Sequence, residues 1–148
     1  FTYADNQLSD PLRLKLPLSL GVTVIAAHIA TTGENEGQEN FLRLQPFFDE
    51  YPNLFTDISS LTQINKRRYL VRALQEGNFK NRMIYGSDWP LQFFPLISPW
   101  WFIDSLPLGD VLLIEREANP FDKDVLIKYA LGVDDGTFLR SRKLLLAQ

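Results

Sequence analysis

The strongest constraint on the fold of this chain is a repeat in which a short apolar segment ends at a polar residue and a helical segment follows. A continuous β-branched apolar run suited to a strand occupies residues 22–27, and two further short strands are predicted at 54–59 and 82–86. Segments with the apolar spacing of a helix lie between them, at residues 38–50 and 63–76. Strands that alternate with helices predict an α/β fold with a parallel sheet and right-handed crossovers.

Each predicted strand carries a polar residue at its end, and these residues are evenly spaced. They are His28, Asp57 and Asp88, which lie 29 and 31 residues apart, the length of one βα unit in each case. The carboxyl ends of parallel strands meet at one edge of a sheet, where open α/β sheets and (β/α)8 barrels bind their ligands. We therefore expect the three side chains to lie close together.

The remaining segments are assigned from local signals. Residues 10–20 have alternating leucines, as in a strand, but Asp10, Pro11 and Gly21 suit the start and the end of a helix, which we prefer. The run 22–27 has no polar alternation, so we expect it to be buried on both faces. An irregular, aromatic region follows the third strand. Two further helices are expected near residues 122–131 and 135–145.

The composition is that of a single globular domain spanning residues 1–148, with 45% hydrophobic and 22% charged residues. A net charge of -3 gives no electrostatic case for a nucleic-acid partner, and no apolar stretch reaches the ~18 residues of a membrane span. The absence of cysteine excludes disulfides and thiolate metal sites and fits a cytoplasmic protein. The basic clusters at 66–68 and 140–143 are interpreted as solvated helix faces.

His28 and Asp88 are the residues best placed to carry chemistry, and each has two interpretations. His28, the only histidine, is either a hydrogen-bonded core residue or a metal ligand or general base. Asp88 precedes Trp89 and Pro90, so it can cap a helix. It can equally be a metal-bound carboxylate that accepts a proton from water and passes it to a leaving group.

Other polar and aromatic residues are assigned more modest roles. Asp57 is expected to be structural, bonding the next loop or orienting a ligand. Glu34 and Glu36 lie on a loop between glycines and are expected to be solvated. The aromatic stretch 93–101 could line a substrate pocket, but packing in the core or against a partner is preferred.

Four segments together resemble the last part of the amidohydrolase-related family, metal-dependent hydrolases with TIM-barrel folds. They are GVTVIAAH at 21–28, LFTDIS at 54–59, MIYGSDWP at 83–90, and the tail NPFDKDVLIKYALG with RSRKLL. The resemblance covers nearly the whole chain, and GSDWP after a short strand is its most specific element. It implies that the βα units correspond to strands 6–8 of a (β/α)8 barrel.

The resemblance also implies roles for two residues. In the family the sixth strand ends in a histidine metal ligand and the eighth in the catalytic aspartate, which correspond here to His28 and Asp88. Both are therefore expected to be catalytic and to bind a divalent metal, zinc in the complete protein. The implied reaction is hydrolysis of a C–N or C–O bond in a small molecule by metal-activated water. Some relatives instead carry out a metal-dependent decarboxylation, and that alternative stays open.

The chain departs from the family in its histidines. The family's histidine pair on the first strand and its histidine on the fifth have no counterpart, because His28 stands alone. A barrel needs ~250 residues, and the chain begins at Phe1 instead of methionine. We therefore expect a piece of a longer enzyme that is inactive by itself, with the metal absent.

A different class of function is also open: an incomplete fold that persists by association. Three parallel strands would leave two bare sheet edges, which predicts a homo-oligomer or pairing with a missing amino-terminal half. In a third reading the chain is an unrelated α/β domain in which Asp88 is only a cap.

Overall fold

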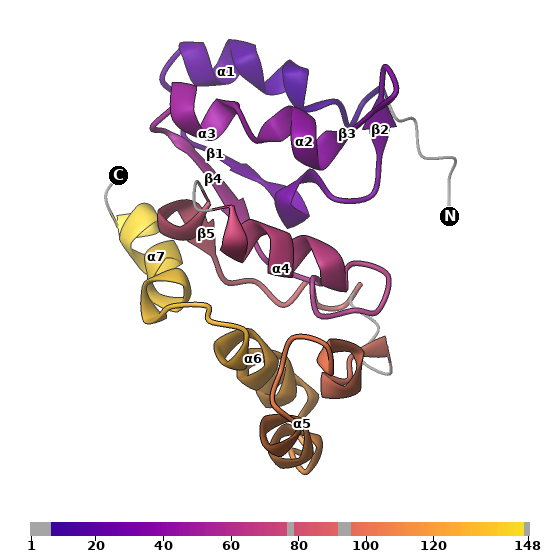
Figure 1. The fold of residues 1–148 in the computed structure, drawn as a ribbon. Coiled ribbons are helices and arrows are strands. Elements are labelled where there is room, and N and C mark those ends of the chain that lie inside the picture. The colour runs from indigo at the N-terminus through magenta and orange to yellow at the C-terminus, as the bar shows by residue number, and fades with distance from the viewer. Residues whose placement is uncertain (1–6, 77–78, 92–95, 147–148) are drawn as a thin grey trace.

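The computed structural model describes residues 7–76, 79–91 and 96–146, and it is a mixed α/β structure built on a three-stranded parallel sheet. The strands are β1 (Val24–Ala26), β4 (Leu54–Asp57) and β5 (Met83–Ile84), in the order β1-β4-β5. The predicted parallel α/β arrangement is confirmed, since β4 pairs in parallel with both neighbours. Figure 1 shows the sheet at the centre of the molecule.

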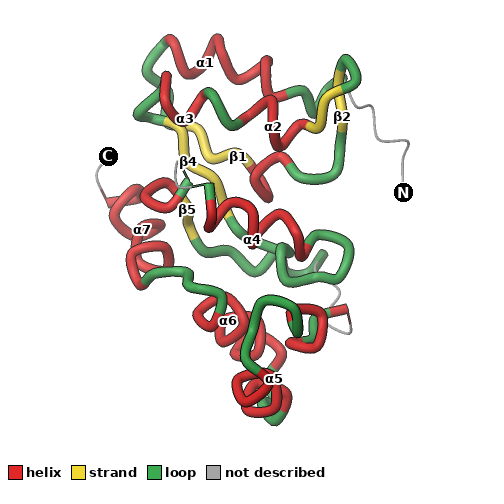
Figure 2. The backbone as a smooth tube through the Cα atoms, viewed as in Figure 1, coloured by secondary structure: helices red, strands yellow, loops and turns green. Residues whose placement is uncertain are grey.

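Helices pack against one face of the sheet and along its β5 edge, and a small hairpin lies beside them (Figures 1 and 2). The α-helices are α1 (Lys15–Ser19), α2 (Asn40–Leu44), α3 (Phe47–Glu50), α4 (Arg67–Gln75), α5 (Leu108–Glu115), α6 (Pro120–Ala130) and α7 (Asp135–Leu146). The 3-10 helices are η1 (Pro11–Leu14), η2 (Ala27–Ala30), η3 (Lys80–Arg82) and η5 (Pro99–Phe102). The antiparallel hairpin is β2 (Glu34–Asn35) with β3 (Gln38–Glu39).

The helical assignment of residues 10–20 is confirmed, and its capping signals act as expected. The Leu12 amide donates to Asp10 Oδ1 over 3.0 Å, and Pro11 occupies the first helical position. Gly21 follows α1 with a φ of 80°, a conformation that glycine adopts without strain.

Two helical predictions need correction. The helix expected over 38–50 is divided into α2 and α3, because Pro46 has no N–H to continue the first helix. Helix α5 lies in the region that was expected to be irregular. Pro107 immediately precedes α5, and Gly109 lies within its first turn, so the local signals for a helix were weak.

The apolar residues form two separate clusters. The larger lies between the sheet and helices α1 to α4, and it includes the stacked rings of Phe41 and Phe79, 5.5 Å apart. The smaller joins η5, α5 and α6 through residues such as Phe102 and Ile127, both fully buried. The segment 96–146 therefore carries a local core beyond the sheet.

One face of the sheet is covered and the other is partly open. The register places Leu54 and Thr56, both fully buried, on the covered face. Ile25 pairs with Phe55 on the opposite face and is 47% exposed. The expectation that 22–27 is buried on both faces is therefore wrong for β1, because a strand at the sheet's edge lacks cover on that side.

The two edges of the sheet differ, which corrects the expectation of two bare edges. Along β5, the Tyr85 amide donates to the Thr137 carbonyl over 3.0 Å, and the Arg140 guanidinium donates to the Met83 carbonyl. Helix α7 thus occupies the outer edge of β5, and Arg140 is not merely a solvated surface residue.

Within the described residues, no strand pairs with the outer side of β1. A groove of about 460 Å³ runs there, lined in part by Ile25, Ala26 and Arg13. Thr31 also lines this groove, and its hydroxyl is buried without a hydrogen-bond partner in the described structure. None of the described helices has the length and apolar character required to cross a bilayer.

Candidate functional site

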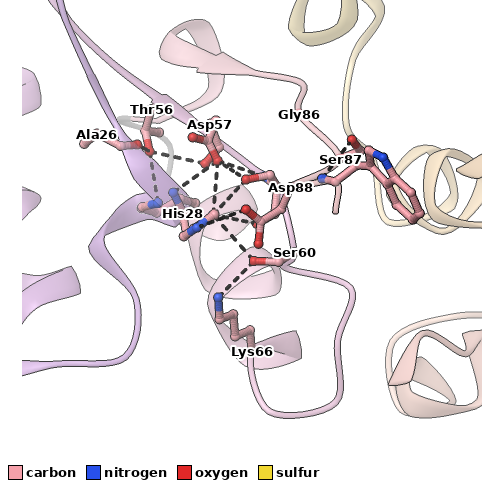
Figure 3. Close-up of polar contacts among 12 residues, drawn as sticks. Ala26, His28, Thr56, Asp57, Ser60, Lys66, Gly86, Ser87 and Asp88 are labelled. Atoms are coloured by element: carbon pink, nitrogen blue, oxygen red, sulfur yellow. Dashed lines mark hydrogen bonds and ion pairs between the residues drawn. The ribbon is translucent and has the colours of Figure 1, made fainter. Parts of the chain in front are cut away.

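The last residue of β4 and the segments that follow β1 and β5 bring Asp57, His28 and Asp88 together at the carboxyl edge of the sheet (Figure 3). His28 Nδ1 lies 3.4 Å from Asp57 Oδ1. On the other side of the ring, His28 Nε2 lies 3.8 Å from Asp88 Oδ1. The imidazole therefore sits between two carboxylates, and all three side chains keep about a quarter or less of their surface exposed, 27% for His28 and 20% for each aspartate.

Asp57 is a hydrogen-bond acceptor for two loops. Its Oδ1 accepts from the His28 amide at 3.1 Å, the Ser59 amide at 3.0 Å and the Ser59 hydroxyl at 2.5 Å. Burial would raise the pKa of Asp57, but the hydrogen bonds from His28 and Ser59 outweigh it and hold the pKa below its usual value. The Asp57 carboxylate therefore links the loop after β1 to the loop after β4. The sequence had instead predicted a bond to the loop of the next strand.

The hydrogen bonds of His28 fix which ring nitrogen carries the proton in the neutral imidazole. Its Nδ1 lies 3.2 Å from the Ser59 carbonyl, which can only accept, and 2.7 Å from the Ser59 hydroxyl. The neutral ring therefore carries its proton on Nδ1, an assignment made from the hydrogen-bond network. Its Nε2 lone pair then points towards an Asp88 oxygen 3.8 Å away, too far for a direct hydrogen bond.

The backbone at this edge of the sheet is strained. His28, Ile29 and Ala30 have φ values of 53°, 54° and 51°, so the chain forms a left-handed turn directly after β1. Ser60 and Asp88, on the other two loops, have φ values of 54° and 61°. Left-handed residues other than glycine cost roughly 1–2 kcal/mol each, and such strain is concentrated at functional sites.

Thr56 helps to hold the left-handed turn in place. Its hydroxyl accepts from the Ile29 amide over 3.0 Å and donates to the Ala26 carbonyl over 2.6 Å. Thr56 and Ile29 are both fully buried, so the turn is tied to β4 inside the core. A strand threonine gives no sequence signal for this role.

The cost of the left-handed backbone can be measured at Thr32, an exposed residue with a φ of 63°. Thr32→Gly should raise the free energy of unfolding by about 0.5–1 kcal/mol, since relief of the left-handed strain exceeds the entropy cost of glycine. The matched control is Thr23→Gly, at an exposed position outside the left-handed region. This substitution should lower the free energy of unfolding. Urea denaturation of both variants provides the comparison; equal effects would refute the strain.

Asp88 does not have the conformation of a helix cap. An N-cap residue has extended backbone angles, whereas Asp88 is left-handed. The Trp89 amide donates to the Ser87 hydroxyl, and the Leu91 amide closes a turn on the Asp88 carbonyl over 2.7 Å. In the described residues around it, the carboxylate of Asp88 is thus left to face His28.

Ser59, His28 and Asp88 have the composition of a Ser-His-Asp triad, but their geometry does not support one. Ser59 is only 4% exposed, so its hydroxyl cannot reach a substrate. A Cβ placed on Gly86 would lie 3.3 Å from the Ser59 Cβ, which shows how closely the third loop covers it. The hydroxyl instead links His28 to Asp57.

The place of Lys66 at this edge of the sheet was not predicted from the sequence. Lys66 was assigned to a solvated helix face, but it is half-buried and its Nζ donates to the Ser60 hydroxyl over 2.9 Å. Burial lowers the pKa of Lys66, although Asp88 and Asp57 act to raise it. Its position in the sequence could have indicated this placement. Lys66 ends the β4–α4 loop, which lies on the same side of the sheet as the polar residues at the ends of the strands.

A buried ion pair lies beneath the same loops and also carried no sequence signal. Lys128 Nζ lies 2.8 Å from Asp124 Oδ2, and both side chains are completely buried on α6. Asp124 accepts from the Thr62 hydroxyl at 2.5 Å and the Tyr85 hydroxyl at 3.2 Å, and Lys128 lies 3.4 Å from the Gly86 carbonyl. The pair therefore connects the loops after β4 and β5.

The other candidate residues lie outside the site. Glu36 has a side chain that is 78% exposed and pairs with Arg43 over 3.1 Å, and Glu34 is also exposed, as expected. In the aromatic stretch, residues 93–95 fall outside the described structure. Ile97, in the middle of the stretch, and Phe102, just beyond its end, belong to the smaller apolar cluster, which agrees with a packing role.

The donor set for a metal ion is incomplete. Among residues 7–76, 79–91 and 96–146, no group of three or more His, Cys, Asp or Glu side chains is arranged to hold one. Two ligands of a tetrahedral zinc ion lie about 3–4 Å apart, so His28 Nε2 and Asp88 Oδ1 are suitably spaced for two ligands. The Nδ1 bond to a carbonyl is also typical of a metal-binding histidine.

Comparison with known proteins returned no match to a family model, a curated protein or a solved structure.

Proposed function

We propose that this chain carries part of the active site of a metal-dependent hydrolase of the amidohydrolase-related kind, acting on a C–N or C–O bond of a small molecule. The observation that carries the proposal is the gap between His28 Nε2 and Asp88 Oδ1. Two electron-pair donors face each other there across 3.8 Å. Such a pair is stabilised when a cation lies between them.

Each of these residues would have a separate role in the reaction. A divalent metal, when bound, supplies a water molecule of lowered pKa. His28 Nε2 and Asp88 are the ligands this chain would provide, and Asp57 and Ser59 keep the imidazole in the required tautomer. Asp88 also accepts the proton of the attacking water and delivers it to the leaving group.

We further propose that β1, β4 and β5 correspond to strands 6–8 of a (β/α)8 barrel. The parallel order, the open sheet face at Ile25 and the unpaired side of β1 support this assignment. The groove beside β1, with the unsatisfied Thr31 hydroxyl, offers space for a neighbouring strand. Closure of a barrel at β5 would require α7 to release the Tyr85 amide and the Met83 carbonyl.

The isolated chain is proposed to be inactive, because a catalytic zinc ion needs about three protein ligands and this edge provides two. The same incompleteness favours the alternative that the chain persists as an incomplete fold that associates, with a second copy or with the missing barrel segment. No metal would then be held tightly by the chain alone.

A zinc titration followed by 15N NMR tests the proposal, and the single histidine makes the result unambiguous. Zinc should bind weakly and shift the Nε2 resonance of His28 far more than its Nδ1 resonance. His28→Ala and Asp88→Asn should each weaken binding tenfold or more, whereas Glu36→Gln, at an exposed site, should not. Binding that is indifferent to His28 and Asp88 would refute the metal site, and stoichiometric zinc with hydrolysis of simple esters would refute the inactivity of the chain.

A further inference from the structure

Lys66 lies at the edge of the candidate site with its ammonium group directed towards Ser60 (Figure 3). The Ser60 hydroxyl in turn lies 3.5 Å from His28 Nδ1. Lys66 thus joins the polar cluster from the β4–α4 loop, on the opposite side of His28 from Thr56. The Asp88 and Asp57 carboxylates act to raise the pKa of Lys66 against the effect of its burial, so its ammonium lies within range of both charges.

The stability of the fold gives little reason for a cation at this position. Within the described residues no carboxylate lies within 4.0 Å of Lys66 Nζ, so its partial burial is not offset by an ion pair. Lys66 also directly precedes α4, whose first turn has no acidic residue. The amino end of a helix disfavours positive charge. The bond to Ser60 uses one of three ammonium protons, which leaves two free to donate.

We propose that Lys66, held in place by the buried Ser60 hydroxyl, binds an oxyanion group, a carboxylate or a phosphate, of the substrate. The inference rests on the proposed function and adds the chemical class of the molecule to it. A bound oxyanion would accept from Lys66 Nζ and lie next to His28, so the group and the bond that is cleaved belong to one small molecule. A neutral hydrophobic substrate would leave the ammonium unpaired in the site, at a cost in binding.

The strained backbone at Ser60 agrees with this role. Its φ of 54° is unfavourable for serine, and glycine would relieve it. The residue is fully buried, and its hydroxyl lies between Lys66 and His28. A hydroxyl kept there at the expense of backbone strain fixes the position of the Lys66 ammonium beside the site.

Oxyanion binding can be measured on the whole metal-free chain by 1H–15N NMR. Sodium acetate and, separately, sodium phosphate replace sodium chloride at constant ionic strength. We expect saturable shifts of the amide resonances of Ser60, Lys66 and Arg67 at millimolar anion concentrations. The binding should be weak because the two nearby carboxylates repel an anion that Lys66 attracts. Lys66→Met should weaken the binding at least tenfold, and the anion that binds more tightly identifies the group.

Arg68→Met is the matched control, because Arg68 is on the same turn but 65% exposed and paired with Glu39. It should bind as the parent does; an equal loss in both variants, or no saturable shift in the parent, would overturn the inference. A second measurement needs no variant: acetate should protect Lys66, but not exposed Lys80, from acylation by a water-soluble reagent, read by mass spectrometry. Equal labelling with and without acetate would also overturn it. These outcomes are independent of zinc binding, so failure of the oxyanion site and failure of the proposed hydrolase are distinguishable.

Discussion

Lys128→Met is expected to lower the free energy of unfolding by about 3–5 kcal/mol, a large part of the stability of a domain of this size. Methionine fills a similar volume, but Asp124 is then left without its cation, and both positions are completely buried. The Thr62 and Tyr85 hydroxyls still donate to Asp124, yet neither neutralises its charge. Urea denaturation at pH 7 measures the loss.

The double variant Asp124→Asn with Lys128→Met separates charge from packing. Asparagine can still accept from Thr62 through its one carbonyl oxygen, its NH2 group can donate to the Tyr85 hydroxyl, and no buried charge remains. The double variant should therefore be more stable than Lys128→Met alone, as found when both members of a buried ion pair are replaced. A double variant that is less stable than the single one would show that the loss comes from packing.

The single variant Asp124→Asn should make stability depend on pH with a definite sign. Burial already lowers the pKa of Lys128, and Asp124 is the main group that acts to raise it, with a smaller contribution from Asp57. Without Asp124 the folded protein holds this proton less well than the unfolded chain, whose lysine titrates near pH ~10.4. Stability should therefore rise between pH 7 and 9, more steeply than in the parent protein. A flat profile in this variant would contradict the assignment.

Asp88→Asn should reduce turnover by about 10²–10⁴-fold in the complete, metal-loaded enzyme, the usual contribution of a general acid–base group. The fold should survive, because asparagine tolerates the left-handed backbone at this position better than most residues. Asp88→Ala is the informative comparison, since it removes the carboxylate and also adds roughly 1–2 kcal/mol of backbone strain.

The two variants give different results for a catalytic and for a structural aspartate. A catalytic Asp88 predicts equally low turnover in both variants and a loss of stability only in the alanine variant. A structural Asp88 predicts turnover that follows stability, with the asparagine variant close to the parent. Steady-state kinetics and thermal unfolding on the same preparations make the distinction.

The sequence was informative where the chemistry is local or periodic. The spacing of His28, Asp57 and Asp88 follows from the length of a βα unit, and these three side chains do meet. Lys66 and the Asp124–Lys128 pair were missed because their significance depends on contacts between distant segments, such as that of Thr62 with Asp124. A helical lysine looks the same in a sequence whether it is solvated or buried.

The incorrect predictions about the fold also have physical causes. Helix α5 was missed because proline and glycine at its start are read as breaks. Ile25 was expected to be buried because a strand's sequence does not reveal whether it lies at an edge. The covered side of β5 depends on where α7 folds back, which no residue near β5 could indicate.

The unequal edges of the sheet limit how copies of this chain can join. Chains with two free edges can add partners without end and grow into filaments, whereas one free edge accepts a single partner. Among the described residues α7 blocks β5, so pairing of β1 with β1 of a second copy would use up the free edge of this sheet in both chains. Self-association through the sheet would therefore stop at the dimer, with no tendency to polymerise.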